Sequence, residues 1–565
     1  MPALRLTSFL RAALLSVGVL LGASCTGIVL AQPERDALAQ APALEDPAEG
    51  VDVQGVPSEP DSPSLAVLRA EAHRAPEDPD VWLNLGNAYL ASDRYNLASE
   101  AFLEAVALDY TFGDAHFGLG LAEFGRGEYE AALFAFNEVT RLYPDRFDGH
   151  FNRGVTLNRL DRPVDAAQAF QEAVETASPE TLPGERAQAL VALAAELSRA
   201  GDYSGAADAY AQALEEDPAG EFGDPYELRF LWAQALYRSG LGLEAMPQLT
   251  ELEAAGTDYR VNALIAQIYL DAGQSDYAAA ALERGIRRAG NAGEQEVQAN
   301  LLVRLGLLQR SAGRFAEAVE SFSRAAQLSP GMWEAHYNLG LTQLDQGRLE
   351  AAAESLEQAL QTGTEAPAAS APGQQEDTRA SRARVLLALA AVYEQLGEAG
   401  AAVRTAEQAV DLAPGDEQVN HGALHVIGRV QYRSGEFETA LETFGRLVSM
   451  NPQDLQAHLW AGLAAYQGQL YGTAVLHYEA VLAENPDDYQ ARYNLAAAYL
   501  AAGRYGDAEV QYRQLIQQDP AQAASHYQLG WALLSQNRRE EARSAWQRSS
   551  EMGYAPAAQA LSTYF

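Results

Sequence analysis

The sequence contains no lysine and one cysteine, Cys25, in 565 residues, so all 39 of its basic residues are arginine. The absence of lysine excludes Schiff-base chemistry, the P-loop lysine and the Ser-x-x-Lys nucleophile pair. A single cysteine excludes an intrachain disulfide and any metal site built from several thiolates. Positive charge is also scarce, because 77 acidic residues give a formal net charge of −38. Nucleic acid is therefore not expected as a partner, since non-specific binding to phosphates needs clustered cations.

The rest of the composition is that of a folded protein. Hydrophobic residues make up 48% of the chain and charged residues 21%, so the chain can bury a core. The length would suit three or four domains, unless internal repeats replace separate domains with one repeated unit.

The first 31 residues have the pattern of an export signal. Arg5 and Arg11 precede an uncharged, mostly apolar run over residues 12–31, which is typical of a secretory signal. Three fates remain open: cleavage after Ala31, lipidation at Cys25 in a segment that resembles a bacterial lipobox, or retention as a membrane anchor. We expect export to the periplasm or cell envelope, with membrane contact only through this segment. Residues 32–63 are rich in proline and acid, which predicts a disordered acidic tether.

A 34-residue period begins at Trp82. The spacing Trp82-x-x-Leu85-Gly86-x-x-Tyr89, followed by Ala98 and Phe102, returns 34 residues later as His116, Leu119-Gly120, Ala132 and Phe136. It continues to the end of the chain, for example at Gly462/Ala474/Tyr478 and at Gly530/Ala542/Trp546. This pattern resembles the tetratricopeptide repeat family, as found in exported bacterial proteins.

The resemblance implies an all-α fold, a right-handed α-solenoid of about thirteen helix pairs. Small residues at the eighth and twentieth repeat positions let the two helices of a pair approach closely, and the aromatic at the twenty-fourth fills the space between pairs. Breaks in the period predict these segments: 64–180 (a capping helix and three repeats), 187–292 (one repeat and two degenerate ones), 299–361 (repeats), 362–378 (a flexible insertion), 379–556 (repeats) and 557–565 (a C-terminal cap).

The sequence predicts no enzyme and no cofactor, because it contains none of the zinc-protease, nucleophile-elbow, P-loop or dinucleotide-binding motifs. Histidine shares the fourth repeat position with Trp82, which indicates packing. His421 and His425 have the i, i+4 spacing of a metal-binding pair. With no third ligand near them in the sequence, no metal site is expected.

The resemblance also implies a partner-binding surface. In this family the first helix of each pair lines the concave face, and the fifth and sixth positions face inward, which agrees with helical geometry. Amides and aromatics at these positions would suit the backbone of an extended peptide. The candidate partner-binding residues are Asn84, Phe117, Phe151, Asn152, Tyr337, Asn338, Tyr493, Asn494, Tyr527 and Gln528.

These features together predict a non-catalytic scaffold or assembly factor of the cell envelope that binds other proteins or extended peptides. The acid excess would steer basic partners toward it. Two alternatives remain: a self-associating structural component of the envelope, or a cytoplasmic regulator if the leader is not used.

Overall fold

The computed structural model describes residues 65–177, 183–220, 224–362 and 372–565. The expected signal segment 1–31 with Cys25, and the expected tether 32–63, lie outside these residues. The described chain contains 28 helices, α3 to α30, and no strand, which confirms the all-α expectation. It divides into two compact units, the first ending at Leu301 and the second beginning at Leu302. None of the described helices is both long and apolar enough to cross a bilayer.

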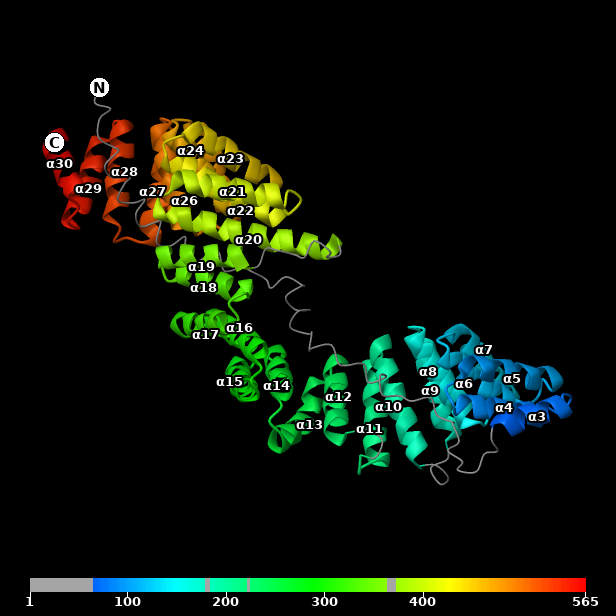
Figure 1. The fold of residues 1–565 in the computed structure, drawn as a ribbon. Helices are drawn as coiled ribbons and strands as arrows, with labels where there is room; N and C mark the ends of the chain where they lie inside the picture. The colour runs from blue at the N-terminus through cyan, green and yellow to red at the C-terminus, as the bar shows by residue number, and fades with distance from the viewer. Residues whose placement is uncertain (1–64, 178–182, 221–223, 363–371) are drawn as a thin grey trace. The chain divides into compact units, whose positions relative to one another are not determined.

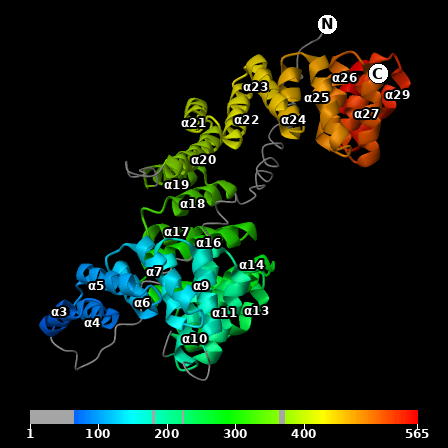
Figure 2. The ribbon, with the colours of Figure 1, turned by 90° about the vertical axis from the view of Figure 1, so that its right-hand side faces the viewer.

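The first unit holds α3 to α15 and the first part of α16, up to Leu301. Figures 1 and 2 show its consecutive helices lying side by side. Their bounds are α3 (Leu65–Arg74), α4 (Pro79–Leu90), α5 (Tyr95–Leu108), α6 (Gly113–Gly125), α7 (Tyr129–Leu142), α8 (Phe147–Arg159), α9 (Pro163–Thr176), α10 (Pro183–Ala200), α11 (Tyr203–Glu216), α12 (Pro225–Arg238), α13 (Gly242–Ala255), α14 (Tyr259–Asp271), α15 (Ser275–Ala292) and α16 (Gln295–Ser311).

The second unit continues from within α16 to the last helix. Its helices also follow one another as neighbours in the stack. Their bounds are α17 (Phe315–Leu328), α18 (Trp333–Asp345), α19 (Leu349–Thr362), α20 (Pro372–Leu396), α21 (Ala399–Leu412), α22 (Glu417–Arg433), α23 (Phe437–Met450), α24 (Leu455–Gln467), α25 (Tyr471–Glu484), α26 (Tyr489–Ala501), α27 (Tyr505–Gln518), α28 (Ala523–Ser535), α29 (Arg539–Glu551) and α30 (Ala555–Tyr564).

The helices from α4 to α29 form thirteen consecutive pairs, the number that the period predicts. We call the first helix of each pair its A helix and the second its B helix. The turn between them needs a residue in the left-handed backbone region, such as Gly127 (φ 78°) or Gly503 (φ 77°). Where glycine is missing, Asp93, Asp161, Gln469 or Asn537 adopts that conformation. Helices α3 and α30 pack against α4 and α29, the outer helices of the first and last pairs.

Close contact between small and aromatic residues forms the core of each pair. Phe102 in α5 is fully buried, and a Cβ atom built on Gly86 in α4 would lie 2.5 Å from its ring. Gly118, in the A helix of the next pair, faces the same ring. One aromatic side chain therefore fills the space within its own pair and against the next one, as expected.

Helix bounds can be compared with three of the expected segments. Helices α10 and α16 begin at Pro183 and Gln295, ahead of the expected 187 and 299. Of the expected insertion 362–378, Thr362 ends α19 and the residues from Pro372 on belong to α20, whereas residues 363–371 lie outside the part of the chain that the structure describes. Proline is favourable at the first helical position, because the N–H that it lacks would have no hydrogen-bond partner there. Pro183 and Pro372 therefore begin helices, although proline is unfavourable inside a helix.

The repeat register makes a prediction for α7. Ala132 is fully buried at the twentieth repeat position, whereas its neighbour Ala131 is exposed. We expect Ala132→Leu to lower the free energy of unfolding by about 1–3 kcal/mol through overpacking. Ala131→Leu should be neutral within about 0.5 kcal/mol. Urea denaturation of the two variants checks this, and equal effects would contradict the register.

Candidate functional site

Three of the ten candidate partner-binding residues are buried, which corrects that part of the expectation. Phe117 is 6% exposed, Phe151 is fully buried and Asn152 is 1% exposed. A partner resting on the surface of the stack does not reach these side chains.

The burial of these three has a local cause in the first unit. Phe151 is packed between Phe147 and Phe170, with ring centroids 5.5 Å away on each side. The amide nitrogen of Asn152 donates a hydrogen bond of 2.8 Å to the backbone carbonyl of Asp148 in its own helix. Phe117 packs edge-on against Phe136 at 5.8 Å. In α6 and α8 the fifth and sixth positions therefore stabilise the stack.

The other seven residues reach the surface. Asn84 in α4 is exposed, and the remaining six are half-buried. These six occupy the fifth and sixth positions of three A helices in the second unit, α18, α26 and α28. They are Tyr337, Asn338, Tyr493, Asn494, Tyr527 and Gln528. We call these six residues the amide–aromatic face.

Contacts within the amide–aromatic face hold its side chains in place. Burial raises the pKa of Tyr493, while a hydrogen bond with Gln528 of the next A helix opposes that rise. Asn494 accepts a hydrogen bond of 3.1 Å from Gln490. Asn338 donates one of 2.8 Å to the backbone carbonyl of Glu334. The bond between Tyr493 and Gln528 connects neighbouring repeats, whereas those of Asn494 and Asn338 stay within their own helices. Together they limit the conformations of the amides before any partner binds.

The fourth repeat position is structural, as expected, and the structure adds its reason. Trp82 Nε1 donates to the carbonyl of Pro76, six residues earlier, at 2.9 Å. The histidines at this position place Nε2 near the carbonyl six residues earlier in the same way, at 2.7 Å in His150 and 2.9 Å in His116. His336, His458 and His526 do so at 3.2–3.3 Å. The position suits a ring with an N–H donor, which bonds the loop just after the end of the preceding helix.

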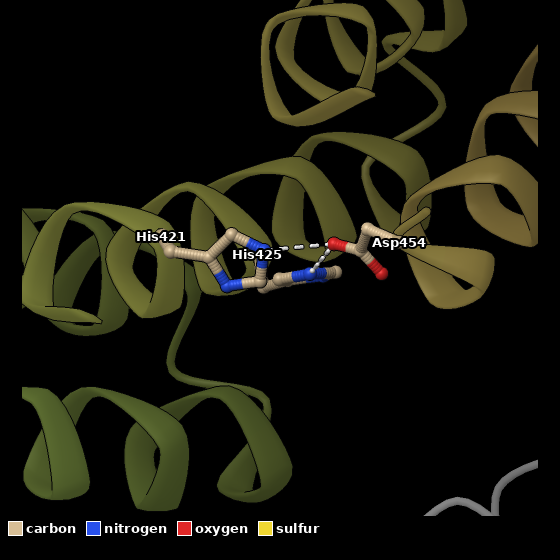
Figure 3. A group of neighbouring side chains, drawn as sticks. All are labelled: His421, His425 and Asp454. Carbon is tan, nitrogen blue, oxygen red and sulfur yellow. Dashed lines mark hydrogen bonds and ion pairs between the residues drawn. The ribbon is translucent and has the colours of Figure 1, made fainter. Parts of the chain in front are cut away.

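The structure also brings a carboxylate to the histidine pair that the sequence shows in residues 421 and 425. His421 and His425 in α22 both contact one oxygen of Asp454, Oδ2, from their Nε2 atoms at 2.8 and 2.9 Å. Figure 3 shows both imidazoles directed at Asp454, at the start of the next A helix. Asp454 is not near the histidines in the sequence, because it lies almost one full repeat further on. The signal that points to it is the repeat spacing, which places the start of the next A helix beside α22.

Paired helices in stacked repeats define the class of protein, an α-solenoid. A tetratricopeptide repeat model matches residues 83–146, 117–180, 264–332, 303–371, 425–489 and 470–523, which together cover more than half of the chain. Two further tetratricopeptide repeat models match residues 499–563 and 383–416. The chain belongs to the tetratricopeptide repeat family. Proteins of this family typically serve as scaffolds for protein–protein interaction, and the fold supports that class of function here.

Among proteins of known identity, the chain is similar to tetratricopeptide repeat protein 8 of Mus musculus and of Homo sapiens. The identity is 30% over 112 residues, which is 19% of this chain and 22% and 21% of the two relatives. The match spans about a fifth of the length of these relatives, so it concerns the repeats and not the whole proteins.

Solved structures with a similar fold include the anaphase-promoting-complex hetero-tetramer Cut9-Hcn1, at 14% identity and a TM-score of 0.33, with 83% of this chain and 99% of that chain covered. A tetratricopeptide repeat protein from Parabacteroides merdae ATCC 43184 has 20% identity and the same TM-score, with 47% and 97% covered. The family rests on the repeat matches rather than on these superpositions.

Proposed function

We propose that this protein is a non-catalytic scaffold of the cell envelope, which binds extended segments of partner proteins along its A helices. The observation that carries the proposal is the amide–aromatic face, which presents the same pair of side-chain types from α18, α26 and α28. An amide donates and accepts hydrogen bonds at once, so it can pair with a peptide backbone whatever the peptide sequence. Tyrosine beside it adds a flat apolar contact with a polar tip.

The net charge supports a preference among partners. At −38 the chain carries a large excess of acid, and complementary potentials accelerate the encounter with a basic partner and disfavour an acidic one. Association with a basic partner should therefore slow as salt is added, because salt screens exposed charges.

Export rests on residues 1–31, whose basic start and apolar run are typical of a secretory signal. The mass of the mature N-terminus in native cells tests it. A chain that starts at Gln32, or at a lipidated Cys25, supports export. An intact Met1 in the soluble cytoplasmic fraction would contradict it.

Crosslinking of the full-length protein in native cells, followed by affinity purification and mass spectrometry, tests the binding surface. The double variant Asn338→Ala/Asn494→Ala should lose most of the crosslinked partner, because two of the three amides of the face are removed. Both amides hydrogen-bond only locally at the surface, so helicity and the melting temperature should stay unchanged.

The matched control is Gln358→Ala/Gln517→Ala, which removes two exposed amides from the B helices α19 and α27. It should retain the partner. If both double variants retain the partner, or if both lose it, the amide–aromatic face is not the binding surface.

A further inference from the structure

We propose that His421, His425 and Asp454 form a binding site for a divalent transition metal of the zinc type, at the joint between the pairs α22/α23 and α24/α25. The three side chains offer two imidazole nitrogens and one carboxylate oxygen, all within 4.8 Å of one another. Two histidines and one carboxylate are a ligand set that zinc takes in proteins, with an open position for a further ligand.

Metal binding requires a local rearrangement of these three side chains. Each Nε2 atom lies 2.8 or 2.9 Å from Asp454 Oδ2. Ligand bonds of about 2.0–2.2 Å in a tetrahedral arrangement would separate neighbouring ligand atoms by about 3.3 Å. An ion would therefore enter as the carboxylate withdraws by a few tenths of an ångström and the two rings, whose centroids are 4.8 Å apart, turn toward each other.

An additional helical turn in α22 creates the histidine pair. Helix α22 has 17 residues, four more than the A helices α24, α26 and α28. Counted forward from Glu417 at the start of α22, His421 is the fifth residue. Counted back from Gly428, which occupies the eighth repeat position against Phe444, His425 is the fifth. Four residues are close to one turn of helix, so the insertion duplicates the inward-facing position and places two imidazoles on one face.

Asp454 is held in place by the helix that it begins. It is the N-cap of α24, and its Oδ1 atom accepts a hydrogen bond of 3.0 Å from the backbone N–H of Ala457. Oδ2 remains directed at the histidines.

Two features set the character of the site. The side chain of His421 is 33% exposed, against 10% for His425 and 9% for Asp454, so an ion can enter from the His421 side and keep a water or a partner's side chain as its fourth ligand. The Nδ1 atom of His425 is buried without a hydrogen-bond partner among the described residues. A supporting hydrogen bond at that nitrogen contributes about 10–100-fold to metal affinity, so we expect the site to bind more weakly than a structural zinc site.

A second histidine pair lies nearby and must be distinguished in any test. His458 and His477 face each other with their Nδ1 atoms 3.1 Å apart. Burial lowers the pKa of His477 to about 4, with a further contribution from His458. No carboxylate completes this pair in the described chain. Zinc bound by the two histidines alone would nevertheless add to the signal of a titration.

The experiment uses the full chain purified without a polyhistidine tag. Co²⁺ is titrated while the visible absorption of tetrahedral cobalt is recorded, and Zn²⁺ is titrated by calorimetry. We expect one ion per chain and a cobalt spectrum that zinc abolishes. His421→Ala and His425→Ala should each weaken binding by at least about tenfold, since each removes a ligand from the first coordination shell. Circular dichroism verifies that each variant retains its helices.

Two controls make the result specific. Asp488 begins α26 and accepts from the N–H of Ala491 at 2.8 Å, so it matches Asp454, but the preceding A helix has Leu455 and Leu459 in place of the histidines. Asparagine caps a helix as well as aspartate does. Asp454→Asn should therefore weaken zinc binding, whereas Asp488→Asn and His477→Ala should not. Unchanged affinity in folded His421→Ala, or loss of binding in His477→Ala alone, would overturn the proposal.

Discussion

Phe136→Ala is expected to lower the free energy of unfolding by about 3–5 kcal/mol, the usual cost of truncating a fully buried phenylalanine. Phe136 in α7 has no exposed surface. A Cβ atom built on Gly120 of α6 would lie 2.5 Å from its ring, and Phe117 packs against it edge-on at 5.8 Å. Removing the ring leaves a cavity that these neighbours cannot close, because their backbone is held by adjacent pairs.

Phe134, two residues away in the same helix, is the matched control. It is 63% exposed, so Phe134→Ala should change the free energy of unfolding by no more than about 0.5 kcal/mol. Urea denaturation gives the size of each effect. Because each repeat contacts only its neighbours, hydrogen exchange should show the loss of protection in Phe136→Ala concentrated in α6 to α8. Equal losses in the two variants would mean that the period assigns the faces of α7 wrongly.

The fold could be predicted from the sequence because most repeats meet the same steric requirement. A small residue such as Gly86 or Gly120 faces a large one such as Phe102 or Phe136, so their spacing marks each pair independently of the others. The pattern is weak in any one repeat, but its return at a fixed period makes the fold class clear even though two repeats are degenerate. The ends of the A helices were harder to predict, because α10, α16, α20 and α22 extend beyond the repeat by amounts that depend on local residues such as Pro183 and Pro372.

The candidate site could be predicted only in part. The fifth and sixth positions point in the same direction in every A helix, yet Phe151 and Asn152 are buried while Tyr493 and Asn494 are half-buried. The direction follows from the helix, but the exposure depends on the bulk of the side chains around it, such as Phe147 in the same helix and Phe170 in α9, which both pack on Phe151. The position within the repeat does not set that bulk.

Glu394→Ala is the second substitution for which we expect a large effect, about 2–4 kcal/mol of lost stability. The side chain of Glu394 in α20 is 3% exposed. Both of its oxygens accept hydrogen bonds from Arg429 in α22, at 2.8 and 2.6 Å, and Arg433 lies 3.1 Å from one of them. Removal of one partner from a buried pair costs about 3–5 kcal/mol, because the other charge is left uncompensated. Arg429 is 21% exposed, so water reduces that cost somewhat.

An exposed pair provides the comparison. Arg548 and Glu551 lie 3.3 Å apart with 60% and 67% of their side chains exposed, and Glu551→Ala should cost no more than about 1 kcal/mol. The cost at Glu394 should persist at high salt, where the small effect at Glu551 disappears.

The double variant Glu394→Met/Arg429→Met separates two explanations of the cost at Glu394. If the loss in Glu394→Ala comes mainly from the unpaired arginine, removing both charges should restore most of the stability, since apolar side chains of similar volume often replace a buried ion pair at little cost. Arg433 is 51% exposed and can turn to solvent when its partner is gone. Urea denaturation of the single and double variants measures the difference. A double variant as unstable as Glu394→Ala would show instead that the ion pair itself stabilises the contact between the A helices α20 and α22.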